Sequence, residues 1–266
     1  RIAMAPSGQL VVSQFNAGQV LLLNPKTLAI EGSIATSRRQ AAVGASNDKI
    51  FVGVETVGAV GVYTYAGQFL HMLGSGLGEF EAPNDLIVDE AAGRVYVVDT
   101  RAKVVKVYSL SDGGFLWSFG TGLMNFPTGI ALDPSSDTLL ISDFGVGKAG
   151  GGSLSFDPES YYAGIWRYDL EGNYVETITG DFSRPQGLAV NGDGVIFLAD
   201  SLLGEILVFQ KDPVAAGYLQ PFSYGGGDVL LRLPLDVVLD PLTQTLYVTN
   251  NLLDKVEAIP GGGNLP

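Results

Sequence analysis

Apolar residues occur along the whole chain in short runs, which are separated by clusters of glycine, proline, aspartate and asparagine. Runs of about four to eight residues that are rich in β-branched and aromatic side chains, and are bounded by such turn formers, are typical of β-strands. No long stretch repeats its apolar residues at the period of an amphipathic helix. The pattern therefore predicts an all-β protein in which helices are nearly absent.

Two kinds of apolar run recur together. The first starts with proline and ends in an acid or its amide, as in Pro83-Asn-Asp-Leu-Ile-Val-Asp89, and the second ends in the same way, as in Val95-Tyr-Val-Val-Asp99. The four copies of the pair are 83–89 with 95–99, 127–133 with 139–143, 185–191 with 196–200, and 234–240 with 246–250. Each proline precedes the end of its second run by 15 or 16 positions. This regularity indicates a repeat protein, whose units bury their apolar faces by stacking.

Each unit has room for four short strands. In the unit that begins near Pro83, we predict strands at 85–89, 95–99, 104–108 and 115–119. Two degenerate units precede it, with predicted second and third strands at 10–12 and 19–23, and at 49–53 and 60–63. Six four-stranded units of roughly 44 residues are typical of propeller blades. We therefore predict a six-bladed β-propeller of four-stranded antiparallel blades, with residues 1–266 as a single domain.

The last unit differs from the others. Strands are predicted at 236–240, 246–250 and 255–259, but the glycine-rich segment 260–266 that follows does not read as a fourth strand. Propellers usually protect such an edge by closing one blade with a strand from the other end of the chain. We therefore expect the last blade either to be incomplete or to be closed by a terminal strand. Because the chain begins at Arg1 rather than at a methionine, we also expect it to be excised from a longer chain.

The repeated runs resemble the NHL repeat family. The phrases Pro185-Gln-Gly-Leu-Ala-Val-Asn191, Ile196-Phe-Leu-Ala-Asp200 and Glu205-Ile-Leu-Val-Phe209 match its first three strands, and Gly67-Gln-Phe-Leu70 and Gly172-Asn-Tyr-Val175 match its fourth. The resemblance covers nearly the whole chain, although the first two units lack the proline phrase. It implies a six-bladed propeller, a fold that in this family often serves as a binding module within a larger protein.

Strand direction alternates within a blade, so the first strand starts on the side where the second strand ends; we call this side the start rim. The residues predicted to lie there are Asn84, Asp85 and Asp236 at the strand-one starts and Asp99, Asp143, Asp200 and Asn250 at the strand-two ends. A short acid that recurs at a strand end organises the next turn by accepting backbone N–H groups. The recurring acids are thus explained as scaffold or as a ligand-binding rim, and an acid–base pair among Asp99, Asp143 and Asp200 is a further reading.

The strand-one starts vary between blades. Two copies carry glycine, at Gly129 and Gly187, and two carry Asp85 and Asp236. Carboxylate and amide oxygens are the ligands that Ca²⁺ takes, so Asn84, Asp85 and Asp236 form a candidate metal site with calcium as the cofactor. The resemblance adds that related calcium-dependent lactonase and arylesterase propellers use an Asn-Gly pair at this place, which Asn84-Asp85 resembles.

One unit carries an insertion at 145–164, between its second and third strands. Long loops in compact domains are often functional, and Tyr161 and Tyr162 in this loop are candidate contact residues because tyrosine suits interfaces. A plain surface insertion is the alternative. The single histidine, His71, is expected on an outer strand, where it does not complete a catalytic triad.

Charge and composition exclude several functions. The chain carries 15 basic and 28 acidic residues, a formal net charge of −13, which argues against nucleic-acid and anionic-membrane partners. It has no cysteine, so disulfides, thiolate metal sites and cysteine nucleophiles are excluded. The acidity would keep an extracellular or periplasmic domain soluble, and we expect the domain to be monomeric.

We therefore expect a non-enzymatic propeller that recognises a protein, peptide or glycan through the start rim. One alternative is a calcium-dependent lactonase or esterase-like hydrolase with its metal at the central channel, and another is a purely structural or sensor domain. Fold alone does not choose among them.

Overall fold

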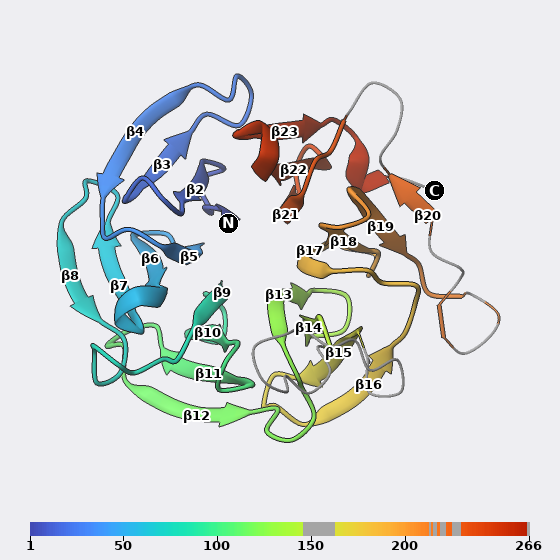
Figure 1. Cartoon of the computed structure of the whole chain (residues 1–266), viewed down its shortest axis with the longest axis horizontal. Helices are drawn as coiled ribbons and strands as arrows, with labels where there is room; N and C mark the ends of the chain where they lie inside the picture. Colours follow the sequence, from blue (N-terminus) through green and yellow to red (C-terminus); the bar gives the residue numbers. More distant parts are fainter. Residues whose placement is uncertain (146–162, 213, 215–216, 219–221, 225–229, 265–266) are drawn as a thin grey trace, which may run out of the picture. The chain divides into compact units, whose positions relative to one another are not determined.

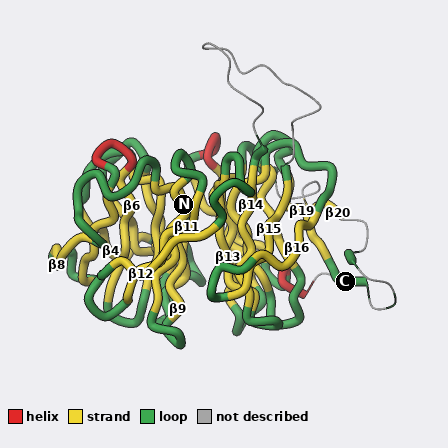
Figure 2. Tube along the Cα trace, turned by 90° about the horizontal axis from the view of Figure 1, so that it is seen from below, coloured by secondary structure: helices red, strands yellow, loops and turns green. Residues whose placement is uncertain are grey.

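The computed structural model describes residues 1–264 except 146–162, 213, 215–216, 219–221 and 225–229. Strands make up nearly all of its regular structure (Figure 2). Among the described residues the helices are three single turns of 3₁₀ type, η1 (Glu55–Val57), η2 (Asn251–Leu253) and η3 (Gly262–Asn264). The prediction of an all-β fold is confirmed. No helix in the described part of the chain is long and apolar enough to cross a membrane.

The chain divides into two compact units, Arg1–Phe119 and Gly120–Pro266, each with three antiparallel sheets. The sheets are the predicted blades. In the first unit, blade 1 is β1 (Ile2–Met4), β2 (Leu10–Gln14), β3 (Gln19–Leu23) and β4 (Ile30–Ala35); blade 2 is β5 (Gln40–Ala45), β6 (Lys49–Val54), β7 (Ala59–Thr64) and β8 (Phe69–Met72); blade 3 is β9 (Pro83–Asp89), β10 (Arg94–Asp99), β11 (Val104–Ser109) and β12 (Phe115–Phe119).

The second unit holds the remaining three blades. Blade 4 is β13 (Pro127–Asp133), β14 (Thr138–Asp143), β15 (Gly164–Asp169) and β16 (Tyr174–Ile178); blade 5 is β17 (Pro185–Val190), β18 (Ile196–Asp200), β19 (Glu205–Phe209) and β20 (Phe222–Tyr224); blade 6 is β21 (Pro234–Asp240), β22 (Thr245–Asn250) and β23 (Lys255–Ile259). Within each blade every strand pairs with its neighbours in sequence. Within each unit the first strands lie on the inner side of the arc of blades and the fourth strands on the outer side (Figure 1).

The predicted strand bounds hold closely. The strands at 19–23, 115–119 and 255–259 have the predicted limits, and the others extend by one or two residues, for example to the proline that opens β9. The prediction of an incomplete last blade also holds, because blade 6 has three strands in the described part of the chain. After β23 the chain turns at Gly261, where φ is +70°, and enters η3.

The apolar core lies between blades. One cluster in the first unit joins Phe51 and Val60 of blade 2 to Val97 and Tyr108 of blade 3, and blades 1 and 2 share another. In the second unit, blades 4 and 5 and blades 5 and 6 are joined in the same way. A single blade therefore cannot bury its apolar faces without a neighbour, as expected for a repeat protein. The boundary between the two units falls between blades 3 and 4, and the assignment of 1–266 to one domain stays a prediction.

Candidate functional site

In blades 3, 4 and 5 the acid at the end of the second strand is fully buried and binds the chain ahead of its own blade. In blade 3 the Asp99 carboxylate accepts the backbone N–H groups of Glu81 and Ala82, at 3.0 and 2.8 Å, just before Pro83. Lys106 Nζ lies 3.1 Å from the same carboxylate. The side chain thus joins the end of strand two to the start of strand one.

We call this contact between the acid and the backbone the clamp. Blades 4 and 5 repeat the clamp and add hydrogen bonds from the turn that follows strand two. The Asp143 carboxylate accepts N–H groups from Asn125 and Phe126, at 2.7 and 2.8 Å, and a third from Gly145 at 2.7 Å. Burial, and then the charge of Asp143, raise the pKa of Tyr168 to about 12, so this phenol stays neutral. The Asp200 carboxylate accepts N–H groups from Ser183 and Arg184, at 2.7 and 2.9 Å, and also from the two leucines that follow it.

Blade 6 has asparagine at this position, and its surroundings change accordingly. Asn250 Oδ1 accepts the Arg232 N–H at 2.8 Å, while its Nδ2 donates to the Leu230 carbonyl at 2.8 Å. The acidic side chain of Glu257 faces Nδ2 at 3.4 Å, where blade 3 places Lys106. An amide has one donor side and one acceptor side, whereas a carboxylate only accepts, so the facing residue is an acid here and a base in blade 3.

These four side chains are less available to a ligand than the sequence indicates. We expected them on a rim in contact with solvent, but Asp99, Asp143, Asp200 and Asn250 are 0% exposed. The backbone that they bind lies 16 to 20 positions earlier in the chain, in addition to the following turn in blades 4 and 5. The physical reason is that an unprotected strand-one start would leave buried N–H groups without acceptors.

A β-bulge follows the opening proline or glutamine in five blades. The register between first and second strands shifts there in blades 2 to 6. A bulge inserts one extra residue and re-aims its side chain. In blades 3, 4 and 5 the extra residues are Asn84, Thr128 and Gln186.

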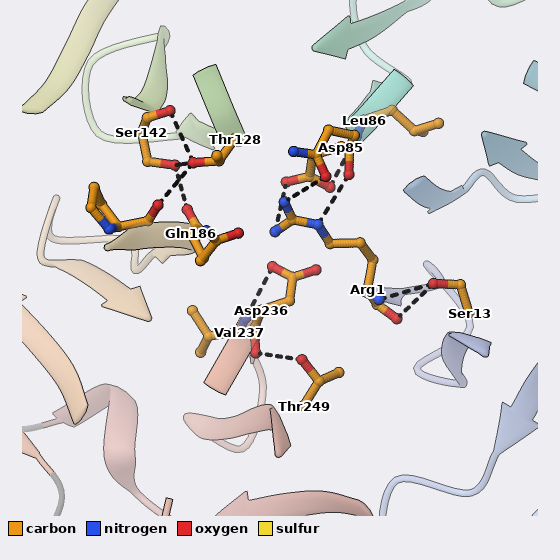
Figure 3. Close-up of polar contacts among 12 residues, drawn as sticks. Arg1, Ser13, Asp85, Leu86, Thr128, Ser142, Gln186, Asp236, Val237 and Thr249 are labelled. Atoms are coloured by element: carbon orange, nitrogen blue, oxygen red, sulfur yellow. Dashed lines mark hydrogen bonds and ion pairs between the residues drawn. The ribbon is translucent and has the colours of Figure 1, made fainter. Parts of the chain in front are cut away.

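In the first unit the re-aimed side chain binds an arginine. Arg1 Nε donates to the Asn84 carbonyl at 3.0 Å, and one of its terminal nitrogens donates to Asn84 Oδ1 at 3.2 Å. Another lies 4.0 Å from the Asp85 carboxylate, and both charged side chains are almost fully buried. Asp85 also accepts the N–H of Leu86 at 2.9 Å (Figure 3). The candidate calcium ligands Asn84 and Asp85 thus already contact a cationic side chain.

In the second unit small residues let neighbouring first strands approach. A methyl group on Gly129 would lie 2.4 Å from the Gln186 carbonyl oxygen, and one on Gly187 would lie 1.7 Å from Asp236 Oδ1. Thr128 Oγ1 donates to the Pro185 carbonyl at 2.9 Å, and the Ser142 hydroxyl donates to the Gln186 carbonyl (Figure 3). Asp236 is buried and accepts the N–H of Val237 at 3.0 Å.

The described residues contain no group of three or more histidine and acidic side chains that could hold a metal ion. Asp85 belongs to the first unit and Asp236 to the second, and each has the contacts given above within its own unit. The calcium site at Asn84, Asp85 and Asp236 stays a prediction from the sequence.

Exposed leucines gather on the start rim of blades 5 and 6, a feature that the sequence analysis missed. They lie in the turns after β18 and β22 and in the segment before β21, and we call them the leucine patch: Leu202, Leu203, Leu230, Leu252 and Leu253. Leu202 and Leu252 are 59% and 66% exposed. A signal was present in the sequence, because Asp200-Ser-Leu-Leu-Gly204 and Asn250-Asn-Leu-Leu-Asp254 place two leucines where turns normally carry polar residues.

Backbone contacts hold the patch together. The N–H of Leu252 donates to the Arg232 carbonyl at 3.2 Å, and Asn250 Nδ2 holds the Leu230 carbonyl. A methyl group on Gly204, beside Leu203, would lie 3.1 Å from the Leu231 carbonyl oxygen. The three segments are therefore neighbours on one side of blades 5 and 6.

The other residues singled out in the sequence are the two tyrosines of the insertion and the single histidine. Tyr161 and Tyr162, and with them the proposed role of the insertion, lie outside the described residues. His71 lies on the outer strand β8, as expected, with Nδ1 3.0 Å from the Met72 carbonyl oxygen.

A buried ion pair in blade 4 was also missed. The Asp133 carboxylate lies 2.6 Å from a terminal nitrogen of buried Arg167. Burial raises the pKa of Asp133, but hydrogen bonds from Ser135, Arg167 and Ser136 outweigh it and hold the pKa below its usual value. Arginine within the apolar run Ile165-Trp-Arg-Tyr168 was the available signal.

Comparison with known proteins identifies the fold. No protein-family model and no curated protein matches the chain. A structure of hydrazine synthase from Kuenenia stuttgartiensis is similar over 97% of this chain and 94% of its own, with a TM-score of 0.70 and 12% identity. This chain is a six-bladed β-propeller.

A second propeller is similar to the same extent. A structure described as a nidogen/laminin complex matches over 96% of this chain and 89% of its own, with a TM-score of 0.74 and 14% identity. One of these two propellers is described as an enzyme and the other as part of a complex between proteins. At such identities the likeness shows the fold alone, and function must be argued from the surface of this propeller.

Proposed function

We propose that this propeller is a binding module that recognises a protein or peptide through the leucine patch of blades 5 and 6. The main evidence is that five leucines, which come from three neighbouring segments of one rim, are exposed. Contiguous apolar side chains on the surface of a soluble domain mark interaction sites more often than chance exposure does. Among the protein, peptide and glycan partners expected from the sequence, aliphatic leucines favour the first two.

The backbone beneath the patch is held in place before any partner arrives. Asp200 accepts four backbone N–H groups, two of them from Leu202 and Leu203, and Asn250 holds both Leu230 and Arg232. A surface that is already ordered loses little conformational entropy on binding. The buried acids therefore support binding indirectly, by fixing the turns that carry the leucines.

The NHL resemblance of the strand phrases agrees with this proposal, since that family often provides binding modules. The alternative of a calcium-dependent hydrolase has no such support among the described residues, where Asn84 and Asp85 contact Arg1. The proposal therefore assigns no catalytic residue to the chain.

Selection from a phage-displayed library of random peptides tests the proposal. We expect selected peptides to bind the native protein and to lose at least tenfold in affinity, measured by biolayer interferometry, when Leu202 and Leu252 are both replaced by aspartate. Removing apolar area from an interface core and adding charge there weakens association.

Leu242 provides the matched control, because it is 92% exposed and lies in the turn between β21 and β22, at the opposite end of blade 6. Leu242→Asp should leave the affinity of the selected peptides unchanged. Peptides that bind both variants as well as the native protein would show that the leucine patch is not the recognition surface.

A further inference from the structure

Basic side chains gather in the start-rim turns of the first unit. These turns are the segments 15–18, 36–39, 55–57 and 100–103, which lie at the ends of strands in blades 1 to 3. They contain one acid, Glu55, and four exposed basic residues, which we call the basic platform: Arg38, Arg39, Arg101 and Lys103. The chain as a whole has a net charge of −13, so a positive region of its surface is a specific feature that attracts anionic partners.

Contacts between the turns make the basic platform one surface. The Arg39 N–H donates to the Phe15 carbonyl at 2.5 Å, and the Arg39 carbonyl accepts the N–H of Glu55 at 3.1 Å. The Arg39 guanidinium lies over the Phe15 ring, 5.6 Å from its centre. The Glu55 carboxylate then lies 3.6 Å from Arg39 and 3.1 Å from Arg101. The basic platform therefore spans three neighbouring blades and has a defined geometry.

The acids nearby do not neutralise this surface. Glu55 is shared by two guanidinium groups, and Arg38 and Lys103 form no ion pair among the described residues. Two further acids lie in the connection before β9. Of these, Glu79 accepts hydrogen bonds from residues outside the platform, and Glu81 forms no ion pair with the platform in the described part of the chain. Arg38 and Lys103 are therefore charges that the first unit itself does not pair.

Two residues of the basic platform hold a backbone conformation that suits glycine better. The angle φ is +65° at Arg39 and +58° at Lys103. Lys103 is the fourth residue of the turn after strand two, and blade 6 has an aspartate there, which tolerates this conformation. The equivalent residues of blades 1, 2 and 5 are Gly18, Gly58 and Gly204, with φ between +56° and +72°. A lysine at a place where glycine is unstrained points to a role for its side chain.

We propose that the basic platform binds an acidic segment of a partner protein. Arg38 and Lys103 pair with its carboxylates directly, and Arg101 takes a further one beside Glu55, since a guanidinium has five N–H donors. Phe15 and Val57, in the same turns, are 40% and 41% exposed. Apolar side chains among the bases favour a peptide, which has apolar groups of its own, over a sulfated glycan. A long polyanion such as a nucleic acid would also meet the negative charge of the rest of the chain.

The site is separate from the leucine patch, and the inference does not rest on the proposed function. The turn Asp99-Thr-Arg-Ala-Lys103 of blade 3 corresponds to Asp200-Ser-Leu-Leu-Gly204 of blade 5. Arg101 thus takes the position that Leu202 has in the second unit. The same turn presents charge in one unit and apolar surface in the other, and we assign to each its own class of ligand.

Peptide selection on a protein without the leucine patch tests the inference. A phage-displayed library of random peptides is selected on the variant in which Leu202 and Leu252 are both aspartate. We expect the enriched peptides to combine several acids with an apolar residue, to bind the native protein, and to bind more weakly as sodium chloride is added. Their affinity, measured by biolayer interferometry, should fall at least about tenfold in the double variant Arg38→Glu/Lys103→Glu. Both side chains are exposed and outside any ion pair described above, so the fold is retained.

The double variant Lys26→Glu/Lys211→Glu is the matched control. It changes the net charge by the same amount, but both lysines are exposed and follow the ends of the third strands β3 and β19, at the other end of their blades from the start rim. It should leave the affinity of the acidic peptides unchanged. An equal loss in the two double variants would mean that net charge and not the basic platform attracts the peptides, and would overturn the proposal.

Glu55 provides a test with the opposite sign. Glu55→Gln removes the carboxylate that competes for Arg39 and Arg101, so the acidic peptides should bind at least about threefold more tightly. Glu31→Gln, at an exposed residue of β4, is its control and should have no effect. Weaker binding by Glu55→Gln would show that the acidic peptides do not contact these arginines, and would overturn the proposal.

Two further outcomes overturn the inference. One is a selection that enriches no peptide, or only peptides without acids. The other is a heparin oligosaccharide that binds with the same dependence on Arg38 and Lys103 when no acidic peptide does, which would assign the basic platform to sulfated glycans. Each of these results leaves the leucine patch standing, because its own test uses the native protein and the leucine variants. Loss of the leucine patch likewise leaves the basic platform unaffected.

Discussion

The start rims of the two units are built from different chemistry. In the first unit they are ionic: Arg1 binds Asn84 and Asp85, and Glu55 lies 3.6 Å from Arg39 and 3.1 Å from Arg101. In the second unit two of the three strand-one starts are glycines, Gly129 and Gly187, and exposed leucines lie in the turns of blades 5 and 6; the third start carries the buried Asp236.

The backbone beneath these surfaces is nevertheless the same. Asp99 in the first unit and Asp143 and Asp200 in the second each accept two N–H groups just before the opening proline. The difference teaches that the clamp sets the shape of a turn, while the exposed residues of that turn are free to differ. Surface chemistry can therefore be changed blade by blade without altering the fold.

The largest effect is expected from breaking the shared clamp. Asp200→Ala removes the acceptor of four backbone N–H groups in a fully buried site, and we expect a loss of about 5 kcal/mol in the free energy of unfolding, measured in urea. Peptides selected for the leucine patch should also bind more weakly, since their turn loses its support. A loss below about 1 kcal/mol would mean that water replaces the carboxylate and that the clamp does not order the turn.

The next largest effect on stability is expected from removing the counter-charge of the buried Asp133 carboxylate, which lies in the second unit away from the start rim. Arg167→Met should cost about 3 kcal/mol at pH 7, because it leaves the buried Asp133 carboxylate without its counter-charge. The lowered pKa of Asp133 means that it stabilises the fold above its unfolded pKa of about 3.9, and that this contribution is lost as the pH falls through the folded pKa.

The difference between native protein and Arg167→Met should therefore shrink from pH 7 to pH 3, because a protonated Asp133 needs no counter-charge. Urea unfolding at the two pH values measures it. A difference that is equal at both would assign the role of Arg167 to packing rather than to charge.

A smaller loss should follow from filling the close approach at the strand-one starts. Gly187→Ala places a methyl group 1.7 Å from Asp236 Oδ1 and 2.7 Å from the Asp236 Cα, so blades 5 and 6 must separate slightly. We expect about 2 kcal/mol of destabilisation, typical of overpacking. Gly192→Ala is the control, because no atom lies within 4 Å of the added methyl. Equal effects at the two positions would locate the cost in backbone entropy and not in the contact between the blades.

The smallest effect on stability is expected at the apolar surface itself. Leu252→Ser should change the free energy of unfolding by no more than about 0.5 kcal/mol, since an exposed side chain outside the core contributes little. The same variant should weaken peptides selected for the leucine patch. A loss of several kcal/mol on thermal unfolding would instead make Leu252 part of the core.

The sequence predicts the fold in detail because its signals are local. Alternating apolar residues, turn formers and the opening proline specify each strand where it stands, and the missing fourth strand of blade 6 is visible in the glycine-rich segment after Ile259. Repetition adds to this, because a strand that is hard to assign in one blade can be assigned from its position in the other blades.

The site is harder to predict because it depends on contacts between distant residues. Asp99 and Asp200 look like rim acids, but their burial follows from N–H groups 16 to 18 positions earlier, which no local pattern indicates. The Arg1 contact with Asn84 spans more than eighty positions and joins two blades. Leu202 and Leu252 would be read as core residues from hydropathy alone, and only the surrounding fold shows them exposed.

The clamp has a consequence for how the chain folds. Because Asp99, Asp143 and Asp200 bind backbone only 16 to 18 positions away, each closes a short loop around the first hairpin of its blade. Closing a short loop costs little chain entropy, and contacts of low sequence separation form quickly. The hairpins of blades 3, 4 and 5 should thus acquire their final shape early and independently, and the slow step should be the packing of one finished hairpin against the next.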